Sequence, residues 1–250
     1  DHPGDTVSLC MSCGNTLLAV VMQFVDFLRR NSDVLEALKQ KTLLLYPLSL
    51  YWEPTLQFNI DSEYPSTSIY PSALVVYLAM QLMTLGCKVI AHAPQPPLDF
   101  YREFDDMSED EQGRQVTKYS SYLDQAKSAD IFLLGVGTGQ HDARYGTVLD
   151  ELGIDLTEQF AEDEGMAGEI GYQPFDPKGQ FAHFPKLIAV TGEELAALSQ
   201  NNTKIIATLG GEQKIPALRA LLQRDQLPFN VLVTDEAIAS IVDRDPAQTW

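Results

Sequence analysis

Short apolar runs alternate along this chain with stretches whose apolar residues recur at helical spacing. The first run covers residues 6–11, and the helical pattern after it ends at Arg29 and Arg30, two cations that suit the C-terminus of a helix. The run at 129–135 is almost entirely apolar, as expected of a strand buried on both faces. This alternation predicts a parallel β-sheet covered by helices, which is an α/β fold of three layers.

The remaining helices, strands and loops are predicted from the same kinds of pattern. Glycines, prolines and alternating apolar positions at 165–184 predict a hairpin or lid, and the aromatic segment 49–70 is expected to be an ordered loop. The acidic run at 103–111 fits a solvated face near a helix start. Neither an internal repeat nor a low-complexity linker occurs, so we expect one domain spanning 1–250. Helices are further expected at 32–40, 72–85, 119–127, 192–199, 214–223 and 235–242, and strands at 42–46, 88–92, 186–190, 204–209 and 230–233.

The charge balance restricts the partners. The chain has 17 Lys and Arg against 35 Asp and Glu, a formal net charge of −18, so the charge argues against unaided DNA binding, which depends on cations that displace counterions. No apolar run reaches the roughly 18 residues of a membrane helix, and we expect no membrane partner. A start without Met, directly before a predicted buried strand, suggests a piece of a longer protein.

Cysteine usage favours a reducing compartment, the cytoplasm, because three cysteines cannot form a disulfide framework. The four histidines are scattered singly, so we expect no metal and no cofactor. Cys10 and Cys13 form a C-x-x-C pattern. A redox pair at the start of a helix is one interpretation, and a small buried residue ending a strand is the other.

Three glycine-containing turns follow predicted strands, where an open parallel sheet binds its ligands. The first contains Gly14, Asn15 and Thr16 at the start of a helix, where backbone N–H groups and the helix dipole suit an anion. The alternative is a turn capped by the Asn15 or Thr16 side chain. No G-x-G-x-x-G follows the first strand, and the chain contains no Walker sequence, so a dinucleotide or P-loop site is not indicated.

The second turn, at 135–139, follows the apolar strand at 129–135, and its glycines, Gly137 among them, allow a ligand to approach the backbone closely. Arg144, shortly after it, either contacts a phosphate or pairs with neighbouring acids on the surface.

The third turn contains Gly210, Gly211 and Lys214. A lysine at a helix N-terminus opposes the helix dipole, and a bound anion would offset that conflict. Lys214 is therefore the strongest candidate that the residues themselves indicate.

These turns, together with several other segments, resemble the effector-binding domain of SorC-type bacterial transcriptional regulators, which are related to the deoxyribonucleoside and central glycolytic regulators. The resemblance rests on a G-G-x-x-K turn at 210–214 and on the segment NVLVTDEAIA about twenty residues later. It also rests on GVG at 135–137, GEI at 168–170 before Phe175-Asp176, AHAP at 91–94 and GNT at 14–16. The chain departs from the family between Tyr46 and Tyr70, where it has a longer aromatic segment.

The resemblance implies a Rossmann-like parallel sheet of the sugar-isomerase/CoA-transferase-like type, which binds a phosphorylated sugar or sugar metabolite. It also implies an N-terminal helix-turn-helix DNA-binding domain, absent from this chain, and a homo-dimer or tetramer. Glu169 would accept hydrogen bonds from sugar hydroxyls, or else stabilise the lid. Arg144 is a lesser candidate, and Asp235 is expected to be an N-cap. By the same resemblance, the phosphate would be surrounded by Gly14, Asn15, Thr16, Gly137 and Lys214.

Two other functions remain open. One is an enzyme of the same fold, such as a sugar-phosphate isomerase or deaminase, with Glu169, Asp142 and His141 as acid or base groups; the chain lacks the Asp-Gly-Ala-Asp-Glu-type stretch of an isomerase. The other is an interaction module without a ligand, using the aromatic segment 49–70 as its interface. The sensor of a regulator, without catalytic activity, is the favoured reading.

Overall fold

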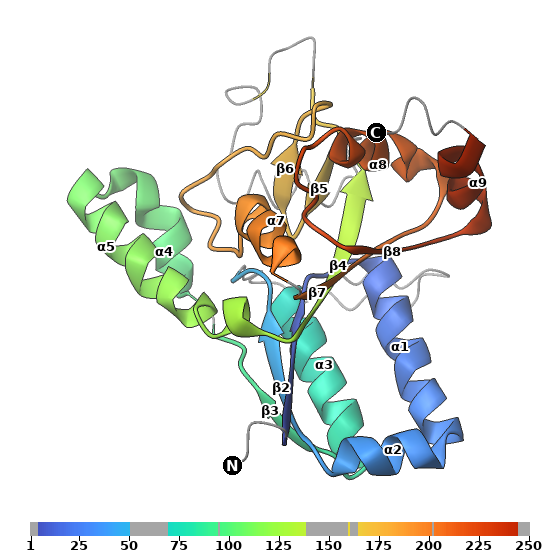
Figure 1. Ribbon diagram of the computed structural model, residues 1–250. Helices are drawn as coiled ribbons and strands as arrows, with labels where there is room; N and C mark the ends of the chain where they lie inside the picture. The colour runs from blue at the N-terminus through green and yellow to red at the C-terminus, as the bar shows by residue number, and fades with distance from the viewer. Residues whose placement is uncertain are drawn as a thin grey trace, which may run out of the picture.

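The computed structural model describes residues 5–50, 70–94, 96–138, 160, 165–201 and 203–244. Its core is a parallel sheet with the strand order β3-β2-β1-β4-β7-β8 (Figure 1). The parallel α/β fold expected from the sequence is therefore confirmed. The strands of this sheet are β1 (Thr6–Met11), β2 (Thr42–Pro47), β3 (Lys88–Ala91), β4 (Ile131–Thr138), β7 (Lys204–Leu209) and β8 (Val231–Thr234).

Strand β4 pairs with three strands, and its parallel neighbour on one side is β1. Its first part, from Ile131 to Gly135, runs parallel to β7, and its end, from Val136 to Thr138, pairs antiparallel with β5 (Gly168–Ile170). Strand β5 in turn pairs with β6 (Gln173–Phe175), so the hairpin expected at 165–184 is present. The hairpin thus continues from the carboxyl end of a central strand.

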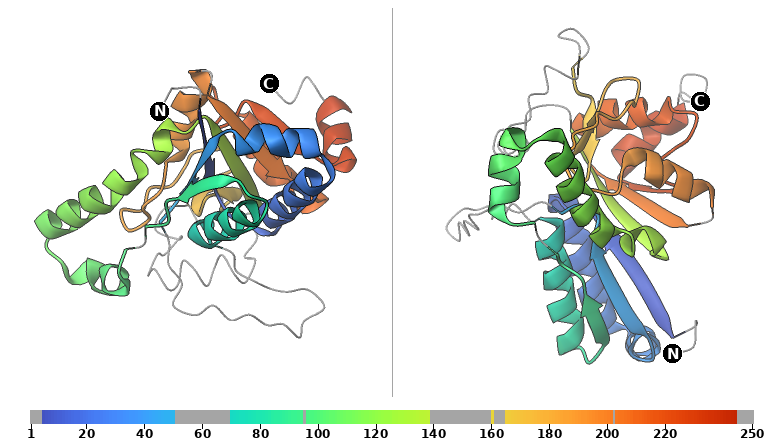
Figure 2. Two further views of the ribbon diagram at one scale, coloured as in Figure 1. Left: turned by 90° about the horizontal axis from the view of Figure 1, so that it is seen from below. Right: turned by 90° about the vertical axis from the view of Figure 1, so that its left-hand side faces the viewer.

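Helices α1 and α3 run side by side, and α4 and α5 project away from the sheet (Figures 1 and 2). A short 3-10 turn, η5 (Glu212–Lys214), precedes α8. The helices are α1 (Asn15–Arg30), α2 (Ser32–Lys39), α3 (Pro71–Thr84), α4 (Leu98–Glu103), α5 (Glu109–Ser120), α7 (Gly192–Gln200), α8 (Ile215–Leu222) and α9 (Glu236–Arg244).

The central strands β1 and β4 have buried apolar side chains on both faces of the sheet. Successive side chains of a strand point to opposite faces. On β4, Leu133 packs with the apolar residues of α1 and α3, whereas Phe132 and Leu134 belong to a second cluster that includes residues of α7 and α8. On β1, Met11 and Cys10 divide in the same way. This alternation gives the three expected layers.

The helix expected at 119–127 was placed wrongly. Helix α5 runs earlier, from Glu109 to Ser120, and 3-10 turns follow at 121–123 and 126–128. Only Tyr119 of α5 is buried, so the helix has no apolar stripe to reveal it. Its N-cap is Ser108, with acidic residues in the first turn, which confirms that the acidic run lies at a helix start.

The strand expected at 186–190 is also wrong. The segment forms only an isolated antiparallel bridge between Ala189 and Ser49. Its Ile188 and Val190 side chains are buried in the core, which accounts for the apolar alternation without an extended ladder. Most of the aromatic segment, 51–69, lies outside the described residues.

Candidate functional site

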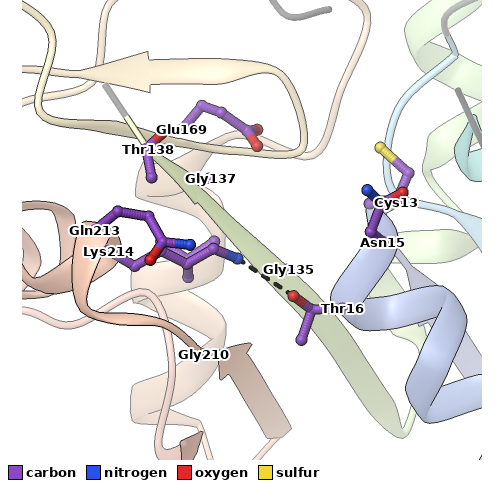
Figure 3. Close-up of a pocket in the computed structure, with 12 residues that line it drawn as sticks. Cys13, Asn15, Thr16, Gly135, Gly137, Thr138, Glu169, Gly210, Gln213 and Lys214 are labelled. Carbon is purple, nitrogen blue, oxygen red and sulfur yellow. Dashed lines mark hydrogen bonds between the residues drawn. The ribbon is translucent and has the colours of Figure 1, made fainter. Parts of the chain in front are cut away.

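The order of the strands reverses between β1 and β4. From β1 the chain proceeds outward to β2 and β3, and from β4 it proceeds the other way to β7 and β8. The carboxyl ends of strands at such a point commonly form ligand sites. A pocket of about 490 Å³ lies there, a volume suited to a small molecule. Its lining residues are Cys13, Gly14, Asn15, Thr16, Gly135, Val136, Gly137, Thr138, Glu169, Gly210, Gln213 and Lys214 (Figure 3).

The N-terminus of α1 forms one side of this pocket. Gly14 is the N-cap, with a φ of 114° that favours glycine, and no side chain caps the helix. The alternative interpretation, in which Asn15 or Thr16 caps the helix, is therefore wrong. The first turn also contains no acidic residue, so the positive end of the helix dipole lies at the pocket without a countercharge on α1.

The turn after β1 is fixed against β4. The Ser12 hydroxyl accepts a hydrogen bond from the Gly135 N–H at 2.7 Å, and the Ser12 N–H donates to the Leu133 carbonyl at 3.0 Å. A Cβ at Gly135 would lie 2.7 Å from the Cys13 carbonyl oxygen, which explains the glycine. Because these contacts join β1 to β4, the glycine turn after β1 and the one at the end of β4 are held together.

Glu169 reaches the pocket from β5 by crossing Gly137. A Cβ at Gly137 would lie 2.2 Å from the Glu169 Oε1 atom, so only glycine leaves room for this carboxyl group. The other oxygen, Oε2, accepts a hydrogen bond from the Tyr172 N–H at 2.8 Å, where the hairpin turns. Both interpretations of Glu169 therefore have support, because the side chain lines the pocket and also stabilises the hairpin.

Burial raises the pKa of Glu169 to about 7, and the Tyr172 N–H and the charge of Lys214 act against that rise. Burial lowers the pKa of Lys214, while the Glu169 carboxylate opposes that shift. The two groups therefore interact electrostatically inside the pocket.

Lys214 lies at the end of η5 and is the N-cap residue of α8. Its Nζ atom donates to the Thr16 Oγ1 atom at 3.3 Å, which brings the third turn against the first (Figure 3). Helix α8 has no acidic residue in its first turn that would compensate the lysine. The conflict with the helix dipole that the sequence indicated is therefore present in the structure.

The turn that carries Lys214 is held by Asp235. Its Oδ2 atom accepts a hydrogen bond from the Gly211 N–H at 2.6 Å, and its Oδ1 atom accepts one from the Ile238 N–H at 2.9 Å. The second of these bonds confirms Asp235 as the N-cap of α9. Both bonds lower the pKa of its carboxyl group.

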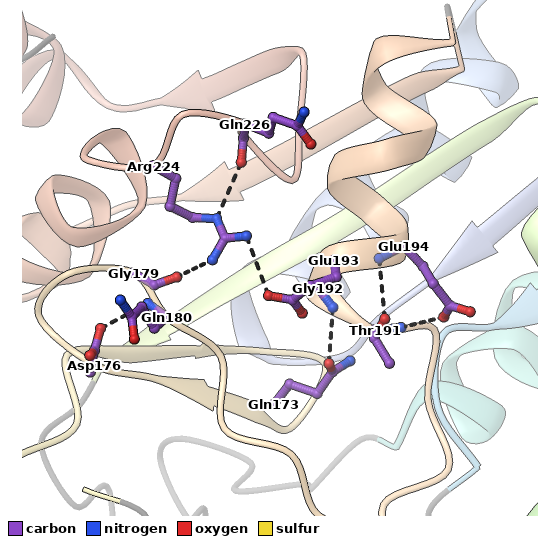
Figure 4. A network of polar contacts seen from close by, with 10 residues as sticks. All are labelled: Gln173, Asp176, Gly179, Gln180, Thr191, Gly192, Glu193, Glu194, Arg224 and Gln226. Atoms are coloured by element: carbon purple, nitrogen blue, oxygen red, sulfur yellow. Dashed lines mark hydrogen bonds and ion pairs between the residues drawn. The ribbon is translucent and has the colours of Figure 1, made fainter.

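The hairpin is anchored on its other side by Gln173 and Arg224 (Figure 4). Gln173 donates to the Val190 carbonyl at 2.7 Å and accepts from the Gly192 N–H at 3.0 Å. Arg224 donates to the Gly179 carbonyl and lies over the Phe181 ring, 4.9 Å from its centroid. These contacts hold β6 and the segment after it against the start of α7 and the residues that follow α8, and β6 in turn pairs with β5, which carries Glu169.

Most of the ligand-binding residues predicted from the sequence lie at this one pocket. The structure brings together at one pocket Gly14, Asn15, Thr16, Gly137, Glu169 and Lys214. Arg144 lies outside the described residues, as do His141 and Asp142. Sequence reasoning did not single out Cys13, Thr138 or Gln213 as ligand-binding, although all three belong to the glycine turns that it identified.

The C-x-x-C pattern does not have the electrostatics of a redox pair. Burial raises the pKa of both Cys10 and Cys13, and the Glu169 carboxylate adds to the rise at Cys13. Redox cysteines need a lowered pKa instead. The described part of the chain contains no cluster of three His, Cys, Asp or Glu residues able to hold a metal ion. No described helix is long and apolar enough to cross a membrane.

Comparison with known proteins gives one family model, described as "Putative sugar-binding domain", which matches residues 107–242. A search of curated protein sequences finds no match.

Several solved structures share the fold. A transcriptional regulator from Streptococcus pneumoniae TIGR4 is 15% identical with a TM-score of 0.55, over 97% of this chain and 79% of that one. A DeoR family transcriptional regulator from Listeria monocytogenes is 16% identical with a TM-score of 0.53, over 95% and 92%. The full-length sorbitol operon regulator SorC from Klebsiella pneumoniae is 18% identical with a TM-score of 0.55, and the match covers 96% of this chain but only 66% of that protein.

Proposed function

Because the chain belongs to the family of sugar-binding domains whose model matches residues 107–242, we propose that it is the ligand-sensing domain of a bacterial transcriptional regulator. Its ligand is a phosphorylated sugar or sugar-derived metabolite. This ligand is bound in the pocket at the carboxyl ends of β1 and β4, where the strand order reverses. The resemblance to SorC-type regulators read from the sequence agrees with the family model and with the fold shared with such regulators.

The observation that carries this proposal is the meeting of two positive groups in one pocket. The N-terminus of α1 has neither a side-chain cap nor an acid in its first turn, and the Lys214 ammonium lies 3.3 Å from Thr16 in that same turn. Helix N-termini and lysines both favour phosphate, and their effects add when they face the same volume. An anionic group of the ligand therefore fits between Gly14, Thr16 and Lys214.

The rest of the ligand would contact Glu169. A carboxyl group beside Gly137 offers oxygens that accept hydrogen bonds from hydroxyl groups, and Thr138 and Gln213 add polar atoms to the same lining. A pocket with a cationic side and a hydrogen-bonding side matches a sugar phosphate, which has one charged end and several hydroxyl groups.

The regulatory part of the proposal follows from charge. With a net charge of −18, the chain needs a cationic partner domain to contact DNA. We assign that role to an N-terminal helix-turn-helix domain, outside this chain, and we propose a homo-dimer or tetramer acting in the cytoplasm. The fit with the sorbitol operon regulator, of which the match covers 66%, supports this arrangement.

A thermal-shift panel tests the ligand class. The panel consists of ribose 5-phosphate, fructose 6-phosphate, glucose 6-phosphate and fructose 1,6-bisphosphate, each paired with its unphosphorylated sugar. A ligand that binds the folded chain raises its melting temperature. We expect a rise with at least one phosphosugar and none with its unphosphorylated counterpart. Equal shifts for a sugar and its phosphate, or no shift across the panel, would contradict the proposal.

One observation favours a second candidate, a sugar-phosphate isomerase or deaminase. The pKa of Glu169 is raised to about 7 beside a lysine, a combination typical of acid–base catalysis. Incubation of the chain with the same phosphosugars, followed by chromatographic analysis of the products, separates the two functions. Turnover that is lost in Glu169→Gln would establish the enzyme, and binding without turnover would support the sensor.

A further inference from the structure

Asp235 connects two segments that are distant in the sequence. It follows β8 and precedes α9, and each of its carboxylate oxygens accepts a backbone hydrogen bond. The Ile238 N–H, in the first turn of α9, donates to Oδ1 at 2.9 Å. The Gly211 N–H, 24 residues before Asp235, donates to Oδ2 at 2.6 Å. An N-cap needs only the first of these bonds, so the second calls for a separate explanation.

The second bond acts on the turn that leads to Lys214. Gly211 has a φ of 92°, a backbone conformation that side chains rarely adopt, and its carbonyl accepts a hydrogen bond from the Lys214 N–H at 3.0 Å. A Cβ at Gly210 would lie 3.2 Å from the Asp235 Oδ2 atom, so the carboxylate lies directly against the turn. The position of Asp235 therefore sets the conformation from which the Lys214 side chain departs.

Among the described residues that line the pocket, Lys214 is the cation. The contact between its Nζ and Thr16 Oγ1, at 3.3 Å, spans the opening between the turn after β7 and the N-terminus of α1. A charged hydrogen bond weakens steeply when its donor is misplaced. A small displacement of the 210–214 turn would consequently move the ammonium away from an anion bound at α1.

We propose that Asp235 is a positioning residue for ligand binding, because its carboxylate holds the Gly210–Lys214 turn and thereby places the Lys214 ammonium against the anionic group of the ligand. This proposal rests on the proposed function. Asp235 itself does not line the pocket, so its effect on affinity passes through Gly211.

The cap and the positioning role can be separated by substitution. In Asp235→Ser, the short hydroxyl still caps α9 through Ile238, since serine is a preferred N-cap residue, but its single oxygen cannot also reach Gly211. Thr191→Ala is the matched control. It removes a comparable cap, the 3.1 Å bond from the Glu194 N–H to the Thr191 hydroxyl, from α7, and α7 contributes no residue to the pocket lining.

The experiment is isothermal titration of wild type, Asp235→Ser and Thr191→Ala with inorganic phosphate and with ribose 5-phosphate. We expect Asp235→Ser to bind both probes about tenfold more weakly than wild type, the equivalent of a single interaction lost. Thr191→Ala should lower the melting temperature and leave both affinities unchanged. Affinities in Asp235→Ser equal to those of wild type would overturn the positioning role.

A second variant covers the case in which Asp235→Ser does not fold. Gly210→Ala leaves the α9 cap intact and presses a methyl group toward the Asp235 carboxylate at 3.2 Å. It should weaken phosphate binding in the same direction, and an unchanged affinity would likewise count against the proposal.

A readout without ligand distinguishes failure of this inference from failure of the proposed function. If wild type binds neither probe in the titration and no phosphosugar in the panel, the proposed function is contradicted. Dimethylation of the lysines with ¹³C-formaldehyde then allows the pKa of Lys214 to be followed by NMR. A pKa that changes in Asp235→Ser but not in Thr191→Ala supports the positioning role, and an unchanged pKa in both variants overturns it.

Discussion

The Lys214 Nζ atom donates a hydrogen bond to the Thr16 hydroxyl at 3.3 Å, although the two residues are 198 positions apart in the chain. The contact joins the turn after β7 to the turn after β1. Strand β4 lies between β1 and β7, and its carboxyl end supplies Gly135 and Gly137 beneath the contact. Three turns that are separate in sequence therefore surround one volume, into which two of them direct positive charge.

Lys214→Met tests the charge in this pocket. Methionine keeps much of the side-chain volume and removes the ammonium, so phosphosugar affinity should fall by about 2 kcal/mol, roughly thirtyfold, as for other hydrogen bonds to charged groups. Titration calorimetry measures the change. Lys88→Met is the control, because it removes an equal charge at the exposed start of β3. That position is at the amino end of an edge strand, whereas the pocket lies at the carboxyl ends of the central strands. Equal losses in both variants would point to net charge rather than to the site.

Gly137→Ala tests how Glu169 enters the pocket. The new Cβ would lie 2.2 Å from the Glu169 Oε1 atom, so the carboxyl group must leave its position or the hairpin must shift. We expect a lower melting temperature and weaker phosphosugar binding. Gly113→Ala, in the exposed part of α5 where a Cβ meets nothing within 4 Å, is the control and should stabilise the chain by about 0.5–1 kcal/mol. A Gly137→Ala chain with wild-type stability and affinity would contradict the packing described.

The raised pKa of Glu169 predicts how stability depends on pH. The pKa of its carboxyl group is about 7 in the folded chain, against the ordinary pKa of 4.5. Between these values the folded chain binds more protons than the unfolded chain, so this group's contribution to the free energy of unfolding falls as pH rises through that window and is constant above it. Each unit of difference corresponds to about 1.4 kcal/mol.

Glu169→Gln isolates this effect. Denaturant unfolding near pH 5 and near pH 8 should show the variant gaining stability relative to wild type at the higher pH, because glutamine has no charge to bury. The same comparison applied to phosphosugar affinity removes the titration of the ligand's own phosphate. Since an ionised Glu169 repels an anion, wild type should lose affinity relative to the variant above pH 7. Parallel pH profiles for the two proteins would show that Glu169 has an ordinary pKa.

The cysteines should be slow to react in the folded chain. Burial raises the pKa of Cys10, Cys13 and Cys87, and the thiolate is the reactive form. Alkylation by iodoacetamide at pH 8, followed by mass spectrometry, should therefore be much slower than in the chain unfolded in guanidinium. Rapid modification of Cys13 in the folded chain, or a Cys10–Cys13 disulfide formed at a mild potential, would support the redox interpretation instead.

Much of the fold could be predicted because the sheet core leaves a strong pattern in the sequence. Strand β1 begins at Thr6 and ends at Met11 as expected, since its apolar run is bounded by turn residues. The position of helix α5 was predicted wrongly because almost none of its surface is buried, so its sequence has no apolar residues recurring at helical spacing. A strand was wrongly predicted at 186–190 for the opposite reason. Ile188 and Val190 are buried by side-chain packing, so the segment has the apolar alternation of a strand, while its backbone forms only one bridge.

The sequence by itself determined the parallel sheet, the three glycine turns and the conflict between Lys214 and its helix dipole, because each depends on neighbouring residues in the chain. Tertiary structure alone decided that the turns meet, that Glu169 crosses Gly137 and that Asp235 holds Gly211. These relationships join residues on different strands, and strand order fixes their distances. Local spacing carries no information about strand order, so a site assembled from several strand ends becomes visible only in the folded chain.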